Sequence, residues 1–498
     1  MLAEPRAGDR VWPLQALTVV IFLVAAILCA LRRTDVDVAW LLTLGEKMLA
    51  GQRVYIDIFE ANPPMSILLY LPAILLGRGV GVAPETVVNI LCLVGAAASL
   101  GLSGRILKPV VGERETLWKL AACGAFVLTV LPTGTFTQRE HIGVIAILPF
   151  LALVIARGAG ARPGLVLAVL AGLGCGVAMA IKPHFAVVTG LPVLVTAWRL
   201  RSIRPIFAVE IWAASAVVVG YGLLLWLVFP AFLDFLPVIR DAYLPVRRPL
   251  SVMLFSPPLP VGLILGALTF WTVRARPGGG WAAASLFTAA LGGAASWMIQ
   301  GKAWAYHGYP ALSLALLALM AAIVLAEKQP ARRFEPMALA RVGMAAVVVA
   351  TSMYWLTLKG DHHTVTPAVA AIQAKPKLLS ITGDIALGHP MVRELKGQWV
   401  GSVCSQWIST GALILEWQGG LSPAKRARLD ALMAMDRRLL TADIIRGRPD
   451  IVLVDVQGFD WGAWAKSDPA LAAALDAYEP VKSVDGIAIW ARKDRARG

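Results

Sequence analysis

The sequence predicts a polytopic α-helical membrane protein of about eleven spans, with a small α/β domain after the last one. Three observations predict this fold. Of the 498 residues, 58 % are hydrophobic and only 15 % are charged, whereas about a quarter are charged in soluble proteins. Apolar runs of near-spanning length follow one another as far as residue 357. From residue 365 onward the sequence mixes polar and apolar residues, and it contains no spanning run.

Twelve apolar runs are candidate spans. A helix rises about 1.5 Å per residue, so about 20 residues cross the hydrocarbon core. The first run is long for a signal peptide and no clear cleavage site follows it, so we expect an uncleaved first helix. The runs cover residues 14–31, 64–77, 86–104, 117–132, 142–156, 164–181, 185–198, 206–229, 255–272, 281–299, 309–326 and 337–357.

Residues 64–77 are the doubtful span, because the run is short and Pro72 interrupts helix hydrogen bonding. We expect this run to lie at the membrane surface as an amphipathic or re-entrant segment. Eleven spans with a cytoplasmic N-terminus place 16 Lys and Arg inside and 11 outside before the C-terminal domain. Twelve spans from the same start give 9 inside and 18 outside, which the positive-inside rule rejects. Twelve spans with the N-terminus outside give 18 and 9, so charge leaves that alternative open.

The net charge of +15 is explained by the basic cytoplasmic ends of membrane helices, and nucleic acid is not an expected partner. The five cysteines form no CxxC or Cys/His metal spacing. We expect a transmembrane domain over residues 1–360, with its first outside loop at 32–85, and a soluble domain over 361–498. In the soluble domain the pattern predicts helices at 423–446 and 469–478 and strands at 451–456 and 486–491.

Polar motifs gather where the predicted helices leave the membrane on the outside. Four of the six histidines lie at or next to these junctions, and the cytoplasmic loops contain none. The helices themselves are nearly free of charge apart from Glu210, whereas a transporter usually has polar groups near the midplane. This pattern predicts a reaction at the membrane surface. The motifs are the loop 32–63, Thr137–His141, Lys182–His184, the loop 230–254 and Gln300–Pro310.

Three of these motifs resemble a known family. The first loop resembles the first periplasmic loop of GT-C glycosyltransferases, which use polyprenyl-phosphate sugars and include protein mannosyltransferases and the lipid A aminoarabinose transferase. Residues 138–141 resemble a second acidic loop of that family, and residues 302–310 its later donor-site loop. Many relatives have Asp-Glu at the first motif. Here the sequence is Asp-Val-Asp, so the resemblance leaves open whether Asp35 or Asp37 is catalytic. The first-loop motif reads Asp35-x-Asp37-x-x-Trp40, Gly45-Glu46, Gly51-Gln52-Arg53-x-Tyr55-x-Asp57 and Asn62-Pro63-Pro64.

The resemblance implies a GT-C fold with juxtamembrane helices and a periplasmic C-terminal domain, in a bacterial inner membrane. It implies transfer of a sugar, with inversion, from a polyprenyl phosphate to a periplasmic glycan, lipid or protein. Asp37 or Asp35 would be the general base. Cations would stabilise the leaving phosphate, and the expected donor-phosphate residues are Arg139, Lys182, His184, Arg247, Arg248, Lys302 and His307. The expected substrate contacts are Trp40, Tyr55, Asp57, Glu60, Asn62, Gln138, Tyr306 and Tyr309.

The sequence leaves three questions open. Magnesium or manganese would suit Asp35 or Asp37 together with Glu140 and His141, but the ligand spacing is not distinctive and a metal-free reaction is the alternative. A flippase of lipid-linked glycan, or a polymerase or ligase with a diphosphate-linked donor, are the alternative functions. The C-terminal domain either binds the acceptor or caps the site.

Overall fold

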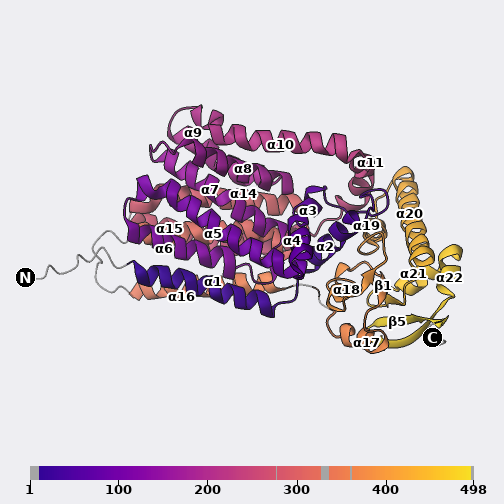
Figure 1. The fold of residues 1–498 in the computed structure, drawn as a ribbon. Helices are drawn as coiled ribbons and strands as arrows, with labels where there is room; N and C mark the ends of the chain where they lie inside the picture. Colours follow the sequence, from indigo (N-terminus) through magenta and orange to yellow (C-terminus); the bar gives the residue numbers. More distant parts are fainter. Residues whose placement is uncertain (1–10, 276, 327–335, 359, 361, 495–498) are drawn as a thin grey trace, which may run out of the picture. The chain divides into compact units, whose positions relative to one another are not determined.

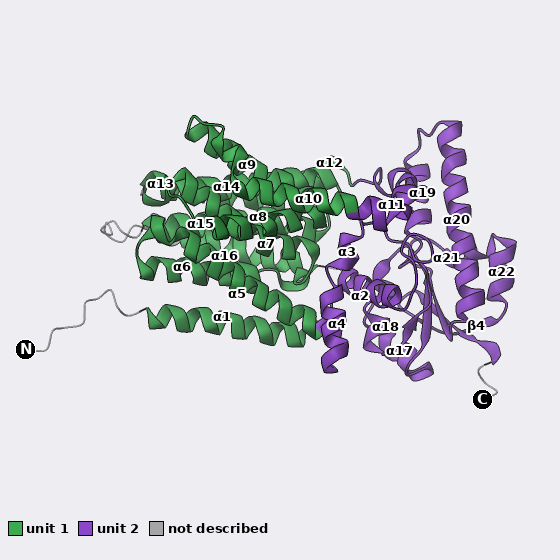
Figure 2. Cartoon of the chain, turned by 45° about the horizontal axis from the view of Figure 1, so that its top comes forward, with its two compact units in different colours: residues 1–32, 86–223, 248–358 green, residues 33–85, 224–247, 359–498 purple. Residues whose placement is uncertain are grey.

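The computed structural model describes residues 11–275, 277–326, 336–358, 360 and 362–494 (Figure 1). The chain divides into two compact units (Figure 2). Unit 1 comprises residues 1–32, 86–223 and 248–358, and unit 2 comprises residues 33–85, 224–247 and 359–498. Unit 2 groups the first loop and residues 224–247 with the C-terminal part of the chain. The predicted domain boundary at residue 360 stays a prediction.

Unit 1 is a helical bundle, and every predicted apolar run other than 64–77 contributes helix to it. These long apolar segments form helices because, in lipid, a single segment can satisfy its backbone hydrogen bonds only as a helix. The main helices are α1 (Trp12–Leu31), α5 (Pro84–Val111), α6 (Arg114–Ala125), α7 (Arg139–Gly158), α8 (Leu165–Ile181), α9 (Phe185–Arg199), α10 (Val209–Val228), α12 (Leu250–Phe255), α13 (Pro258–Ala275), α14 (Gly280–Gln300), α15 (Ala305–Ala326) and α16 (Pro336–Thr357). A π-helical turn, η1 (Phe126–Val130), extends α6, and the 3-10 turns are η2 (Thr133–Thr135), η3 (Arg204–Phe207) and η5 (Pro277–Gly279).

Among the described residues, seven helices are long and apolar enough to cross a membrane, and several apolar helices are shorter. The protein is therefore polytopic, as predicted, while the count of eleven spans stays a prediction. The seven are Trp12–Leu31, Pro84–Val111, Arg139–Gly158, Val209–Val228, Leu250–Ala275, Gly280–Gln300 and Ala305–Ala326.

Helices α7 and α15 form the centre of unit 1. In each of these two helices, 83 % of the most apolar stretch of 18 residues is buried, against 11 % in α1 and 6 % in α10. The apolar outer faces of α1 and α10 fit contact with lipid, as a membrane span requires. Small residues let the inner helices approach closely. At Gly293 of α14, an added Cβ would lie 2.7 Å from the backbone nitrogen of Ala311 in α15.

The doubtful run 64–77 forms two short helices in unit 2, α3 (Met65–Leu68) and α4 (Leu71–Val80). The ten residues of α4 rise about 15 Å, about half the hydrocarbon thickness. One face of α4 is buried at Ala73 and Ile74, and Leu75 and Leu76 are exposed. This geometry supports the prediction of a surface segment.

Unit 2 contains a five-stranded mixed sheet with the strand order β2-β1-β3-β5-β4. Strand β3 is parallel to β1 and antiparallel to β5, and all five of its residues are buried, as expected for a central strand. The strands are β1 (Lys377–Ile381), β2 (Gln398–Trp399), β3 (Ile451–Asp455), β4 (Tyr478–Val484) and β5 (Ile487–Arg492). The predicted small α/β domain is therefore present as a mixed sheet with helices.

The helices of unit 2 pack on this sheet and on the first loop. Side chains of α20, α21 and α22 form one apolar core with β1 and β3. The helices are α2 (Val36–Leu49), α3, α4, α11 (Pro230–Val238), α17 (Val365–Ile372), α18 (Met391–Glu394), α19 (Trp407–Gln418), α20 (Pro423–Gly447), α21 (Trp461–Lys466) and α22 (Pro469–Leu475), with the short turns η4 (Ile239–Tyr243) and η6 (Ile385–Leu387). The predicted helix 469–478 ends at Leu475, and Tyr478 begins β4 instead.

Candidate functional site

The predicted site residues fall into two groups, one in each unit. Unit 1 contains Gln138, Arg139, Glu140, His141, Lys182, His184, Arg248, Lys302, Tyr306, His307 and Tyr309. Unit 2 contains Asp35, Asp37, Trp40, Tyr55, Asp57, Glu60, Asn62 and Arg247.

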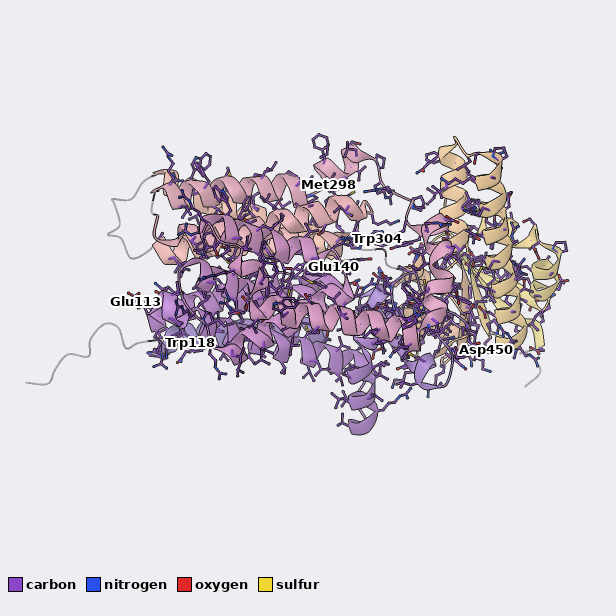
Figure 3. The ribbon with its side chains drawn as sticks, turned by 90° about the horizontal axis from the view of Figure 1, so that it is seen from above. Glu113, Trp118, Glu140, Met298, Trp304 and Asp450 are labelled. Carbon is purple, nitrogen blue, oxygen red and sulfur yellow. The ribbon has the colours of Figure 1, made fainter. Side chains whose placement is uncertain are left out.

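In unit 1, helix ends bring three predicted motifs together around Lys182. Glu140 lies in the first turn of α7, Lys182 follows α8, and His307 lies in the first turn of α15. The Lys182 ammonium donates a hydrogen bond to Glu140, and its Nζ lies 3.2 Å from Gln300 Oε1 and 3.0 Å from His307 Nε2. Figure 3 labels Glu140 and Trp304 at the same end of the bundle. The cluster therefore collects residues from four helix ends.

Two buried polar atoms of this cluster have no hydrogen-bond partner in the described part of the chain. They are Oε2 of Glu140 and Nδ1 of His307, and the two side chains are 2 % and 3 % exposed. An ammonium can only donate, so Nε2 of His307 accepts from Lys182 and the ring proton is assigned to Nδ1. Within the described chain, the cluster thus has one free donor and one free acceptor. Buried polar atoms normally have a hydrogen-bond partner, so these two atoms are suited to bind a ligand or water.

Aromatic rings and further cations surround the cluster. The Lys182 Nζ lies 5.5 Å from the ring centroid of Tyr306, within the range of a cation–π contact. The Tyr306 and His307 rings are 4.5 Å apart in an edge-on arrangement. Burial, and then the charge of Lys182, lower the pKa of His184, so His184 is neutral at pH 7. Lys302 is 9 % exposed, and it lies in the loop between α14 and α15.

The other predicted residues of unit 1 differ in burial. Gln138 and Arg139 are buried at the start of α7. Arg248 is exposed, and its backbone N–H donates to the Gly301 carbonyl at 2.8 Å. Arg248 and Lys302 therefore lie on adjoining segments of unit 1.

His141 and Tyr309 bond to the helix bundle itself. Nδ1 of His141 accepts from the Thr137 backbone N–H at 3.1 Å, and its Nε2 lies 2.7 Å from the Leu128 carbonyl. The Tyr309 hydroxyl donates to the Val127 carbonyl at 2.8 Å. Both carbonyls belong to η1, where the π-helical turn changes the backbone pairing. Our proposed site leaves these two residues out because their polar atoms already have partners.

In unit 2, the first loop places its two aspartates at the start of α2. Asp35 is the N-cap residue, and its Oδ1 accepts from the backbone N–H groups of Asp37 at 2.9 Å and Val38 at 3.4 Å. Ser, Thr, Asp and Asn are preferred there because their oxygens satisfy unpaired backbone donors. Asp37 lies one residue into the helix and is half-buried. The structure thus gives Asp35 a local structural role that Asp37 does not share.

Glu60 organises the rest of the first loop. Its Oε2 accepts from Trp40 Nε1 at 2.6 Å, and its Oε1 accepts from the Asn62 backbone N–H at 3.0 Å. Trp40 is fully buried, and Tyr55 donates to the Asn62 carbonyl. These bonds fold residues 55–62 against α2, so the predicted substrate contacts Glu60 and Asn62 first serve the shape of the loop.

Asp57 and Arg247 are exposed predicted residues of unit 2. Asp57 pairs with Arg53, whose hydrogen bond lowers the pKa of the Asp57 carboxyl below its ordinary value. An exposed pair of this kind contributes little to stability.

The candidate metal ligands are divided between the two units. Among the described residues, no group of three or more His, Cys, Asp and Glu is placed to hold a metal ion. Asp35 and Asp37 belong to unit 2, and Glu140 and His141 belong to unit 1, where both nitrogens of His141 have backbone partners. Magnesium or manganese dependence stays an open alternative to a metal-free reaction, and no step proposed below passes through a metal.

The fold defines a class of protein, a polytopic helical membrane protein that has a small mixed-sheet domain at its C-terminal end. Over its whole length it is similar to ArnT from Cupriavidus metallidurans. The structure bound to undecaprenyl phosphate aligns with a TM-score of 0.57 and 15 % identity over 99 % of each chain. The apo structure aligns with a TM-score of 0.56 and 13 % identity over 96 % of this chain and 97 % of ArnT. The predicted resemblance to GT-C glycosyltransferases is confirmed at the level of the fold.

The archaeal oligosaccharyltransferase AglB from Archaeoglobus fulgidus, solved with an inhibitory peptide and a dolichol-phosphate, aligns with a TM-score of 0.43 and 12 % identity over 97 % of this chain and 75 % of AglB. No family model and no curated protein sequence matches the chain.

Proposed function

We propose that this protein is a membrane glycosyltransferase that moves a sugar from a polyprenyl-phosphate donor to a periplasmic glycan, lipid or protein. The observation that carries the proposal is the buried cluster of Glu140, Lys182 and His307 at the helix ends. Its fold context supports the proposal, because ArnT has been solved with undecaprenyl phosphate bound. We further propose eleven spans, a cytoplasmic N-terminus and a periplasmic C-terminal domain, in a bacterial inner membrane.

The cluster suits the polar head of a lipid-phosphate sugar. The unpaired Nδ1–H of His307 donates, and the unpaired Oε2 of Glu140 accepts. A sugar hydroxyl both donates and accepts, so it satisfies both atoms at once. Lys182 supplies a positive charge for the phosphate, with Lys302, Arg139 and Arg248 as further cations of the same unit. Such preorganised cations stabilise the negative charge that develops on a leaving phosphate.

Asp37 is our candidate for the general base. The acceptor hydroxyl attacks the anomeric carbon and gives its proton to the Asp37 carboxylate. The bond between that carbon and the phosphate oxygen breaks, and the polyprenyl phosphate leaves as an anion. A single displacement of this kind inverts the anomeric centre. Asp37 is preferred to Asp35 because the Asp35 carboxylate caps α2.

The test uses the full-length protein in nanodiscs with a panel of polyprenyl-monophosphate sugars. We expect release of polyprenyl phosphate that depends on an added acceptor and is lost in Asp37→Asn. Diphosphate-linked donors form the second arm and test the polymerase or ligase alternative. Movement of intact donor across a bilayer, without release of lipid phosphate, would instead support a flippase.

A further inference from the structure

A guanidinium of the C-terminal part of unit 2 joins the first-loop helix α2 to Glu85, the last residue of the segment 33–85 of the same unit. Arg393 lies in α18, and it forms a bidentate pair with Glu46 of α2, with distances of 2.8 Å and 3.0 Å. The same side chain donates to Thr43 Oγ1 at 3.2 Å and, through Nε, to Glu85 in the first turn of α5. The Arg393 side chain is only 11 % exposed. One residue therefore connects three segments of the chain.

The charge and the shape of Arg393 both matter at this position. Burial lowers the pKa of Arg393, but the carboxylates of Glu46 and Glu85 raise it by more, so its pKa lies above the ordinary value. A planar guanidinium binds a carboxylate with two parallel hydrogen bonds, which a lysine ammonium does not reproduce. The Arg393–Glu46 pair thus fixes the direction of the Glu46 side chain as well as its distance.

A second contact lies one turn closer to the start of α2. The His389 ring lies between two tryptophan rings, with centroids 5.2 Å from Trp40 and 4.6 Å from Trp399. Burial, and then the charges of Arg393 and Lys47, lower the pKa of His389 to about 3, so the ring is neutral. It therefore packs as an aromatic group beneath Trp40, which in turn donates to Glu60.

A third contact lies toward the end of α2. Lys47 donates to the Gly401 carbonyl at 2.9 Å, and Asp443 of α20 accepts from the Ser402 backbone N–H at 2.6 Å and from its hydroxyl at 2.7 Å. The backbone N–H of Phe59 donates to the Ser402 carbonyl at 2.8 Å. Burial lowers the pKa of Lys47 to about 8, while the nearby charge of Asp443 opposes that shift.

These contacts matter because α2 has only 14 residues. Isolated helices of that length are marginal in water, so tertiary contacts must hold them. The contacts at Trp40, Thr43 and Glu46 recur at helical spacing, and they follow Asp37 on the same short helix. Rotation or tilting of α2 would move the Asp37 carboxylate with it. A displacement of about 1 Å at a reacting group can reduce a rate by about 100-fold.

We propose that the C-terminal domain positions α2 for the reaction, and that Arg393 is the positioning residue. The part that concerns Asp37 rests on the proposed glycosyltransferase function. The domain then acts on the proposed base through α2. This role differs from the two expected from the sequence, which were binding the acceptor and capping the site. Arg393 holds Glu46, and through it holds the helix on which Asp37 lies.

The test compares Arg393→Met and Arg393→Lys with a matched control, Glu394→Gln. Glu394 follows Arg393 in α18 and also pairs with the first loop, through Arg33, but it is 32 % exposed. Hydrogen exchange of α2 amides is measured in the full-length protein in nanodiscs. We expect about tenfold faster exchange of α2 in Arg393→Met, an intermediate rate in Arg393→Lys, and no change in Glu394→Gln or in helices α7 and α15.

A kinetic measurement separates positioning from donor binding. With a polyprenyl-monophosphate sugar that the wild type uses, we expect kcat to fall about 10- to 100-fold in Arg393→Met, while KM for the lipid donor stays within about twofold. Arg393 and Glu46 act through the same ion pair. Adding Glu46→Gln to Arg393→Met should therefore lower kcat little further.

One further variant keeps the test decisive if Arg393→Met folds poorly. The triple variant Arg393→Met, Glu46→Gln, Glu85→Gln removes the carboxylates that would be left without their cation. Wild-type exchange and a wild-type kcat in this variant would overturn the proposal, as would an equal effect of Glu394→Gln. If the wild type transfers no sugar at all, the proposed function fails, whereas faster α2 exchange in Arg393→Met would still support the positioning of α2.

Discussion

The Lys182 Nζ lies 3.0 Å from Nε2 of His307, although the two residues are 125 positions apart in the sequence. The same ammonium donates to the Glu140 carboxylate, which is 2 % exposed. Removing one member of such a buried group leaves an uncompensated partner, which commonly destabilises a protein by about 3–5 kcal/mol. A test of the proposed role of Lys182 in sugar transfer must therefore separate that role from its contribution to stability.

Lys182→Met should lower the sugar-transfer rate by about 100- to 1,000-fold, the loss expected when a donor to a developing oxyanion is removed. It should also lower the free energy of unfolding, because Glu140 is left buried without its cation. Release of polyprenyl phosphate measures the rate, and thermal unfolding in detergent measures the stability.

The double variant Lys182→Met, Glu140→Gln is the control for stability. Without the unpaired carboxylate it should regain most of the lost stability and none of the lost rate. A double variant that transfers sugar at the wild-type rate would contradict a direct role for Lys182 in binding the donor phosphate.

Asp37→Asn and Asp35→Asn should have very different effects. Asparagine is as good an N-cap as aspartate, so Asp35→Asn keeps the cap of α2 and should keep the rate within a few fold. Asp37→Asn removes the proposed base and should lower kcat by at least about 100-fold. Rates are measured at equal amounts of folded protein. The reverse result, with Asp35→Asn inactive and Asp37→Asn active, would move the base to Asp35.

Helices and their order follow from the sequence because a membrane span needs a long apolar run, which is a local signal. The sequence also predicted that residues 64–77 differ from the other runs, since Pro72 and the short length are visible locally. Strand β4 was missed because it lies at the edge of the sheet and five of its seven residues are exposed, which leaves little apolar pattern to read. The helix expected at 469–478 ends early because β4 takes Tyr478.

The sequence allowed the polar motifs of the candidate site to be predicted, but not which residues of these motifs contact one another. Glu140, Lys182 and His307 come from three different polar motifs, and their common location at helix ends follows from the one-sided distribution. No local sequence pattern indicates that Lys182 donates a hydrogen bond to Glu140. Arg393 was missed altogether because its partner Glu46 is 347 residues away and the sequence around it looks ordinary. Long-range contacts of this kind require the fold.

Glu210 should prove structural, although it is a carboxylate within a predicted span. It is 2 % exposed, and its Oε2 accepts from Arg157 Nη2 at 2.8 Å. Glu210→Gln leaves the guanidinium with a weaker partner, so we expect the free energy of unfolding to fall by about 3–5 kcal/mol at most. The transfer rate per folded molecule should not change, since the pair lies at the end of α7 opposite Glu140. A large loss of rate with unchanged stability would instead show a functional role.

Asp436 provides a prediction with a defined pH dependence. It is fully buried in α20, where its Oδ2 accepts from the Ser409 backbone N–H at 3.0 Å. Burial raises the pKa of the Asp436 carboxyl from 3.8 to about 6, so between these values the folded protein keeps a proton that the unfolded chain has lost. The tighter binding of this proton by the folded protein stabilises it. This contribution to the free energy of unfolding is fully present below pH 3.8 and is lost as the pH rises through about 6.

Asp436→Asn should therefore stabilise the protein at pH 7.5 and have no such effect near pH 4. At pH 7.5 the folded wild type holds a buried charge, whereas asparagine keeps an oxygen for the Ser409 N–H and carries no charge. A shift from 3.8 to about 6 corresponds to about 2–3 kcal/mol in the free energy of unfolding. Thermal unfolding of the full-length protein at the two pH values measures the difference. Asp430→Asn is the matched control, because Asp430 is exposed on the same helix and its replacement should change stability little at either pH. An equal stabilisation at both pH values would mean that asparagine acts through packing or hydrogen bonding rather than by removing a buried charge.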